Sequence, residues 1–156
     1  MKPVTCAVHP NSSPNQREVA RPELRNLPRA EEKFRPRVLV VDDEPLIRWS
    51  VCESLLELGY DVEQATDAAA ALRTVTTAPL PFNVVVLDLR LPDMDDLSLL
   101  ATLRQLIPRA RLVLMTAFGT PEIFDNAKAL GAGVINKPFE LDDLTRLVAS
   151  AGPGVA

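Results

Sequence analysis

Short apolar runs that stop at a polar residue constrain this fold more than any other feature of the sequence. Four unbroken runs stand out, and a weaker fifth begins at Val62. An unbroken run rich in β-branched residues indicates a strand covered on both faces, which is typical of a parallel sheet. Three of these runs are four residues long, Val38–Val41, Val84–Leu87 and Leu112–Met115, and the last is the short run Val134–Ile135.

The segments between the runs carry apolar residues at helical spacing. Pro45 suits the first turn of a helix that Gly59 ends, Asp67 suits an N-cap, and Pro121 opens another helix that ends at Gly131. The spacing predicts helices over residues 45–58, 68–75, 99–106, 121–130 and 141–148. Strands joined by helices of this length need right-handed crossovers. We therefore predict an α/β fold, a three-layer doubly wound (βα)5 sandwich around a parallel five-stranded sheet.

Residues 1–36 have a different composition from the rest of the chain. They hold six prolines and few large apolar side chains, so they cannot bury enough surface to offset their ordering entropy. We predict a disordered, proline-rich extension over 1–36, a folded domain over 37–151 and a short tail over 152–156. The extension has a formal charge of +3 and the remainder one of −7. An acidic body argues against nucleic-acid binding by the domain and suits a cation site.

The cysteines and the hydropathy of the chain bear on its location. Cys6 and Cys52 have neither metal-ligand nor disulfide-framework spacing, and no run approaches the roughly 20 apolar residues of a membrane span. The amino terminus also lacks the apolar core of a signal peptide. The sequence thus favours a cytoplasmic protein without membrane contact.

Polar residues follow four of the five predicted strands. They are Asp42 and Asp43, Asp88, Thr116, and Lys137. Singly, Asp88 and Thr116 have a simpler explanation as strand ends, and Lys137 as a surface cation. Together at one sheet edge, however, three carboxylates call for a cation such as Mg²⁺, and a lysine and a threonine can bind phosphoryl oxygens. The set indicates phosphoryl transfer to a carboxylate.

The combined motifs resemble those of bacterial response-regulator receiver domains over residues 37–151. The stretches 42–49 and 116–119 are most similar to receivers that precede ATPase transcription activators of the nitrogen-regulation type. The matching residues are Asp42-Asp43, Asp88, Leu91-Pro92-Asp93-Met94-Asp95, Thr116-Ala117 and Lys137-Pro138-Phe139.

The resemblance implies a chemical role for each matching position. Asp88 would accept phosphate from a phosphohistidine and form an acyl phosphate. Mg²⁺ would bind to Asp42, Asp43, Asp88 and the backbone carbonyl of Arg90.

Two further matching positions would bind the transferred group. The resemblance implies that Thr116 and Lys137 bind the transferred phosphoryl oxygens, that the Lys137–Pro138 peptide is cis, and that the sheet has the flavodoxin-like strand order 2-1-3-4-5. Three positions depart from the family pattern. Val134 replaces a frequent aromatic residue, and Asp96 and Ala68 replace frequent glycines.

The function expected from these features is a stand-alone phosphoacceptor switch that catalyses its own phosphorylation and dephosphorylation. Its partners would be a sensor histidine kinase or histidine phosphotransfer protein, an unknown downstream protein, and in the phosphorylated state a second copy of the chain. One alternative is a metal-dependent aspartyl-phosphate phosphatase or phosphotransferase, which would need an Asp where Arg90 stands. Another is a receiver fragment of a longer transcription regulator. A nucleotide-binding protein is disfavoured because no Gly-Lys-Ser/Thr loop follows a strand.

Overall fold

The apolar runs form one parallel sheet in the computed structural model, which describes residues 34–150. The strand order is β2-β1-β3-β4-β5, so the predicted fold class and order are confirmed. The predicted extension lies outside the described residues except for 34–36, and so does the predicted tail. The strands are β1 (Arg37–Val41), β2 (Asp61–Ala65), β3 (Val84–Asp88), β4 (Arg111–Thr116) and β5 (Gly133–Asn136).

Register in the sheet decides which strand ends meet. β1 pairs with both β2 and β3, and Val41 lies opposite Leu87. β4 pairs with β3 and β5, and Thr116 lies opposite Asn136. The residues that follow these pairs therefore emerge at one edge, where loops are free of the packing that buries the strands.

Four of the five helices begin at the predicted residue and end within two residues of the predicted end, whereas α4 begins one residue early, at Ser98, and ends at Leu106 as predicted. Pro45 occupies the first turn of α2, the Asp67 carboxylate caps α3, and the Thr120 hydroxyl caps α5 by accepting a hydrogen bond from the Ile123 N–H at 3.3 Å. The helices are α2 (Pro45–Glu57), α3 (Ala68–Thr77), α4 (Ser98–Leu106), α5 (Pro121–Ala129) and α6 (Leu141–Ala149).

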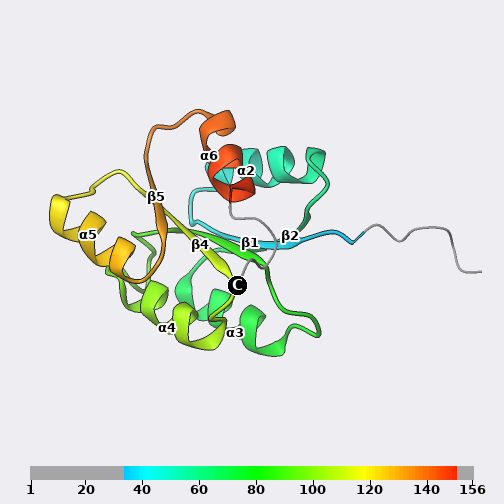
Figure 1. Ribbon diagram of the computed structural model, residues 1–156, viewed down its shortest axis with the longest axis horizontal. Coiled ribbons are helices and arrows are strands. Elements are labelled where there is room, and N and C mark those ends of the chain that lie inside the picture. Colours follow the sequence, from blue (N-terminus) through cyan, green and yellow to red (C-terminus); the bar gives the residue numbers. More distant parts are fainter. Residues whose placement is uncertain (1–33, 151–156) are drawn as a thin grey trace, which may run out of the picture. The chain divides into compact units, whose positions relative to one another are not determined.

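The helices cover both faces of the sheet and enclose two hydrophobic cores. Figure 1 shows α2 and α6 on one face and α3, α4 and α5 on the other. α2 contributes Cys52 and Leu55 and α6 contributes Leu144 to one core, and the opposite core includes Leu39 and Leu100. This arrangement explains why the central strands are apolar on both faces.

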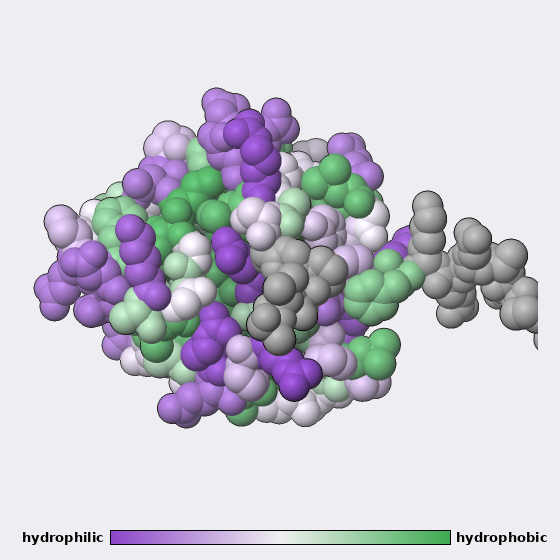
Figure 2. Space-filling view, viewed as in Figure 1, coloured by the Kyte–Doolittle hydropathy of each residue, from purple (hydrophilic) through white to green (hydrophobic). Residues whose placement is uncertain are grey.

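The outer surface mixes apolar and polar side chains. On the face in Figure 2, hydrophobic residues lie between hydrophilic ones. Several large apolar side chains are exposed, including Trp49 on α2 and Phe118 after β4. Among the described residues, no helix combines the length and the apolar character needed to cross a membrane.

Candidate functional site

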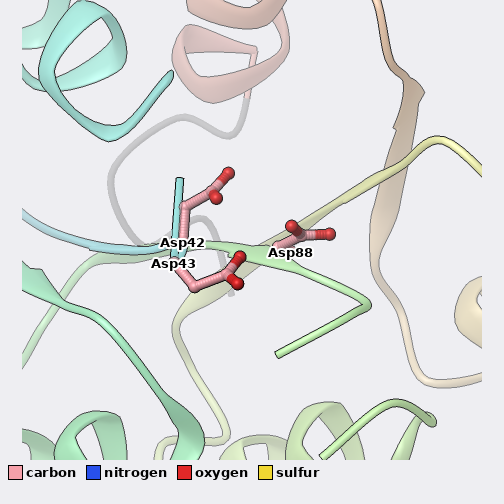
Figure 3. Close-up of side chains that lie close together, drawn as sticks. All are labelled: Asp42, Asp43 and Asp88. Carbon is pink, nitrogen blue, oxygen red and sulfur yellow. The ribbon is translucent and has the colours of Figure 1, made fainter. Parts of the chain in front are cut away.

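Three carboxylates meet where β1 and β3 end. Asp88 is the last residue of β3, while Asp42 and Asp43 follow β1 directly. Because β1 and β3 are neighbours in register, the loop after β1 lies beside Asp88, as Figure 3 shows. One oxygen from each carboxylate lies within 4.8 Å of the others. Asp42 is fully buried and Asp88 is 7% exposed, whereas Asp43 is exposed, so the acidic group opens to solvent at Asp43.

The Lys137 ammonium lies among these carboxylates. Lys137 follows β5, and its Nζ donates to Asp42 Oδ2 at 2.9 Å and to Asp88 Oδ2 at 3.0 Å. A longer contact of 3.3 Å reaches Glu44 Oε1. The Lys137–Pro138 peptide is cis, as the resemblance implied. Lys137 and the acids that it contacts, which are 49 to 95 residues away in the sequence, thus form one ionic cluster at the sheet edge.

Burial and charge shift two pKa values in this cluster. Burial raises the pKa of Asp42 above its ordinary value, although the hydrogen bonds from the Glu44 N–H and from Lys137 oppose the shift. Burial alone would lower the pKa of Lys137, but the hydrogen bonds and charges of Asp42 and Asp88 raise it. Lys137 is therefore a permanent cation at neutral pH.

Thr116 and Lys137 are connected through the backbone. The Lys137 N–H donates to the Thr116 carbonyl at 2.8 Å. The buried Thr116 hydroxyl accepts a hydrogen bond from the Phe118 N–H at 3.0 Å. Since a hydroxyl is also a donor, the Thr116 hydroxyl can still donate a hydrogen bond to an oxygen of a bound group. The structure thus brings the polar residues of β4 and β5 to the edge that holds the carboxylates.

Arg90 contributes backbone and side chain to different contacts. Its N–H donates to Asp88 Oδ1 at 3.1 Å, within the loop that joins β3 to α4. Its guanidinium lies over the ring of Phe118, 3.7 Å from the centroid. The loops after β3 and β4 are consequently held together beside Asp88. Val134, which replaces a frequent aromatic residue, packs against the core that contains Leu39.

Sequence reasoning did not identify several contacts that shape the site. Glu44 approaches Lys137, and Arg48 Nη1 donates to the Asp42 carbonyl at 2.7 Å. Asp93, in the loop that follows Asp88, accepts hydrogen bonds from the first N–H groups of α3. The position of Glu44 directly after the two aspartates was a usable signal, whereas the other contacts depend on the tertiary fold.

The carboxylate group fits a small divalent cation. Mg²⁺ favours oxygen ligands at about 2.0–2.1 Å, so oxygens on opposite sides of the ion lie about 4.2 Å apart. The 4.8 Å limit that encloses the oxygens of Asp42, Asp43 and Asp88 is close to this value. The raised pKa of Asp42 also indicates that the hydrogen bonds and charges of the protein do not fully offset the cost of burying its ionised carboxylate.

Comparison with known proteins gives a consistent result. The family model described as "Response regulator receiver domain" matches residues 38–149. Sporulation initiation phosphotransferase F of Bacillus subtilis is 32% identical over 109 residues, which make up 69% of this chain and 86% of that protein. Regulatory protein AtoC of Escherichia coli is 33% identical over 116 residues, 74% of this chain and only 25% of AtoC. The matched region therefore corresponds to only about a quarter of the length of AtoC.

Solved structures agree with the sequence matches. Chemotaxis response regulator CheY4 of Vibrio cholerae has a TM-score of 0.68 and 30% identity, and the match covers 76% of this chain and 99% of CheY4. A CheY-like receiver domain from Methanospirillum hungatei has a TM-score of 0.70 and 30% identity, with 75% and 93% of the two chains covered. Both matches thus cover about three quarters of this chain and nearly all of the solved one.

Proposed function

Because the chain belongs to the response-regulator receiver family, whose members are phosphorylation-activated switches, we propose that Asp88 is its phosphoacceptor. The observation that supports this assignment most directly is the position of the Asp88 carboxylate. It ends the central strand β3, lies beside two further carboxylates, and accepts a hydrogen bond from the Lys137 ammonium at 3.0 Å.

The proposed reaction is a transfer from nitrogen to oxygen. An Asp88 carboxylate oxygen attacks the phosphorus of a phosphohistidine, and the phosphorus–nitrogen bond breaks with its electron pair returning to the imidazole. Lys137 and the Thr116 hydroxyl then bind phosphoryl oxygens, since both can donate hydrogen bonds at this edge. Hydrolysis of the acyl phosphate by water restores the free carboxylate.

Receiver domains generally use Mg²⁺, and we propose that Asp42, Asp43, Asp88 and the Arg90 carbonyl hold this ion here. When bound, the ion offsets the repulsion between the Asp88 carboxylate and the anionic phosphoryl group. Lys137 would leave its present contact with Asp88 Oδ2 for a phosphoryl oxygen, and this shift would pull on the loop after β5. The movement of that loop, together with the loop holding Thr116, is the proposed signal.

Receivers take phosphate from histidine kinases and act on downstream partners. For this chain we propose a sensor kinase or a histidine phosphotransfer protein as donor. The name of the Bacillus subtilis relative, a phosphotransferase, favours onward transfer to a second histidine protein as one route of output. Phosphorylation-dependent pairing of two copies remains a second proposed route, and the cytoplasmic location stays a prediction.

The phosphatase alternative finds little support. The residue two positions after Asp88 is Arg90, and its guanidinium stacks on Phe118. Arginine at this position cannot serve as the acid or base of a small-molecule phosphatase, because it keeps its proton.

Incubation with acetyl phosphate and MgCl₂ tests the assignment by the mass of the intact protein. We expect a gain of one phosphoryl group, which requires Mg²⁺ and is absent in Asp88→Asn. Thr120→Val is a matched control, since Thr120 caps α5 in the same loop as Thr116 but does not belong to the site. Continuous phosphate release without an accumulated adduct would favour a turnover enzyme. An unmodified protein would overturn the proposal.

A further inference from the structure

The Asp93 carboxylate ties the loop after Asp88 to the start of α3. The Ala68 N–H donates to Asp93 Oδ1 at 2.8 Å, and the Ala69 N–H donates to Oδ2 at 2.9 Å. The partners are 24 and 25 residues apart in the sequence. β2 and β3 are not neighbours in the sheet, because β1 lies between them. Asp93 therefore joins two loops that strand pairing leaves separate.

Helix α3 already has an ordinary cap. The Ala70 N–H donates to Asp67 Oδ1 at 2.7 Å, and the Ala71 N–H donates to the Asp67 carbonyl at 3.0 Å. The first N–H groups of a helix have no partner within it, and because Ala68 is only 1% exposed, its N–H depends on a partner in the protein, which is Asp93. The two bonds to Asp93 are strong enough to lower its pKa. Since Asp67 also caps the helix, Asp93 shares the capping of α3 and in addition attaches the loop after Asp88 to it.

The loop between Asp88 and Asp93 is short and fixed at both ends. At one end the Arg90 N–H donates to Asp88 Oδ1 at 3.1 Å. At the other, Leu91 and Met94 exchange backbone hydrogen bonds of 2.9 and 3.2 Å, which makes a tight turn with Asp93 near its tip. The Arg90 carbonyl lies between these two anchors. Its position accordingly depends on where Asp93 holds the turn.

The loop that precedes α3 is attached to the acidic group as well. The Asp42 N–H donates to the carbonyl of Ala65, the last residue of β2, at 3.1 Å. Covalent and hydrogen bonds thus connect Asp42 to the end of β2, then through the first turn of α3 to Asp93, and along the loop back to Asp88. Lys137, which donates to both Asp42 and Asp88, joins the two ends of this path. The path links both segments that supply the proposed ligands.

We propose that Asp93 is a positioning residue for the proposed cation site: by binding the first turn of α3, it holds the Arg90 carbonyl at the distance from Asp42 and Asp43 that Mg²⁺ requires. This inference rests on the proposed function of the site. Groups that orient ligands from outside the coordination shell commonly affect metal affinity by about 10-fold or more. Asp93 contributes to the site through the backbone and does not contact the acidic group itself.

Two pairs of variants separate positioning from simpler effects. Asp93→Ala and Asp67→Ala each remove a carboxylate that caps α3, but only the first frees the loop after Asp88. Asp93→Asn and Asp95→Asn each remove one negative charge from that loop. The Asp95 side chain makes no hydrogen bond or ion pair within residues 34–150, so its variant isolates the effect of charge.

The first measurement is amide hydrogen exchange in the metal-free protein. We expect Asp93→Ala to speed exchange at Leu91 and Met94 and at the start of α3. Asp67→Ala should speed exchange at the start of α3 alone. Equal exchange at Leu91 and Met94 in the two variants would show that Asp93 does not hold the loop, and would overturn the inference.

The second measurement is titration with MgCl₂, followed by the amide shifts of residues 42–44 and 88–90. We expect about 10-fold weaker binding in Asp93→Ala and a smaller loss in Asp93→Asn, which keeps one carbonyl acceptor. Asp67→Ala and Asp95→Asn should bind nearly as the unchanged protein does. Phosphorylation of Asp93→Ala by acetyl phosphate should be slow at low Mg²⁺ and recover at saturating Mg²⁺.

The outcomes distinguish this inference from the proposed function. If the unchanged protein binds Mg²⁺ and is phosphorylated, but Asp93→Ala behaves as Asp67→Ala does, only the role of Asp93 is wrong. Equal losses in Asp93→Asn and Asp95→Asn would likewise reduce the effect to charge and overturn positioning. Failure of the unchanged protein to be phosphorylated would instead contradict the proposed function.

Discussion

At the scale of single residues, the Lys137 ammonium is the cation that holds the acidic group together in the absence of a metal. It donates to Asp42 and Asp88, and the three side chains are at most 8% exposed. Removing one partner of a buried ion pair typically destabilises a protein by about 3–5 kcal/mol. For Lys137→Ala we expect a loss of about 3 kcal/mol in the free energy of unfolding, measured with urea in EDTA at pH 7.

Glu44 provides the matched control for this loss. It also contacts Lys137, but its side chain is 57% exposed. An exposed ion pair contributes about 0–1 kcal/mol, so Glu44→Gln should change the unfolding free energy little. Similar losses in the two variants would contradict the idea that burial makes the Lys137 contacts important.

The raised pKa of Asp42 predicts an unusual pH dependence. An acid whose pKa is higher in the folded state binds more protons there than in the unfolded chain, so its contribution to stability falls as pH rises. The fall begins near its ordinary pKa of 3.8 and ends above its raised value. We expect the unfolding free energy of the unchanged protein in EDTA to decline with pH in this window, relative to that of Asp42→Asn. A parallel pH dependence in the two proteins would show that Asp42 is not responsible.

The sequence predicted which acids and cations lie at this edge, but not all of their contacts. Asp42 and Asp88 could be placed because each directly follows an apolar run, Lys137 because it comes one residue after another, and parallel strands end at one edge. Asp93 could not be linked to α3 in this way. Its contact depends on the turn at Leu91–Met94 and on the distance between two loops, and neither leaves a pattern in the sequence.

At the scale of secondary-structure elements, the loops after β3 and β4 are joined by the stack of Arg90 on Phe118. A cation–π contact at an exposed site contributes about 0.5–1 kcal/mol. If the stack limits the access of water to phosphorylated Asp88, Phe118→Ala should speed loss of the phosphoryl group by about two- to fivefold. The decay of the acetyl-phosphate adduct, followed by intact mass, measures this rate.

A companion variant checks that the stack is responsible. Phe118→Tyr keeps an aromatic ring beneath the guanidinium and should leave the decay rate near that of the unchanged protein. Arg90→Ala should resemble Phe118→Ala, because either change removes the contact. An unchanged decay rate in Phe118→Ala would show that the stack does not shield Asp88.

Element boundaries show where local sequence signals are sufficient. Pro45, Asp67 and Pro121 marked the starts of α2, α3 and α5 because a proline or a capping carboxylate acts within one turn. The end of α3 was predicted at residue 75 and lies at Thr77. No strong terminating residue stands before Pro79, whose ring disfavours helical backbone at Ala78, and Ala78 is extended, so the helix ends at Thr77.

At the scale of the whole molecule, metal binding should appear as added stability. A ligand that binds only the folded state stabilises it by about 2.7 kcal/mol at a concentration 100 times its dissociation constant. We expect MgCl₂ to raise the Tm of the unchanged protein in a concentration-dependent way. Asp43→Asn should weaken this response. Asp61→Asn should retain it, because Asp61 is an exposed acid at the start of β2, at the opposite end of the β1–β2 pair from Asp42. Equal responses would place the bound ion elsewhere.

The overall architecture was largely predictable because alternation of strands and helices leaves few ways to build a sheet. Buried runs such as Val84–Leu87 required helices on both faces, and the structure has them. The strand order came from the resemblance, since periodicity alone does not say that β1 lies between β2 and β3. The predicted disorder of residues 1–36 stays a prediction.

The buried thiol of Cys52 can serve as a chemical probe for local opening between α2 and the sheet. Its side chain is 2% exposed, and burial raises its pKa to about 11, so an alkylating reagent meets neither an open path nor a thiolate. In a Cys6→Ser background, labelling of the remaining thiol would report each opening event. If Mg²⁺ or phosphorylation slows that labelling, the acidic edge and the helix that follows it open as one unit.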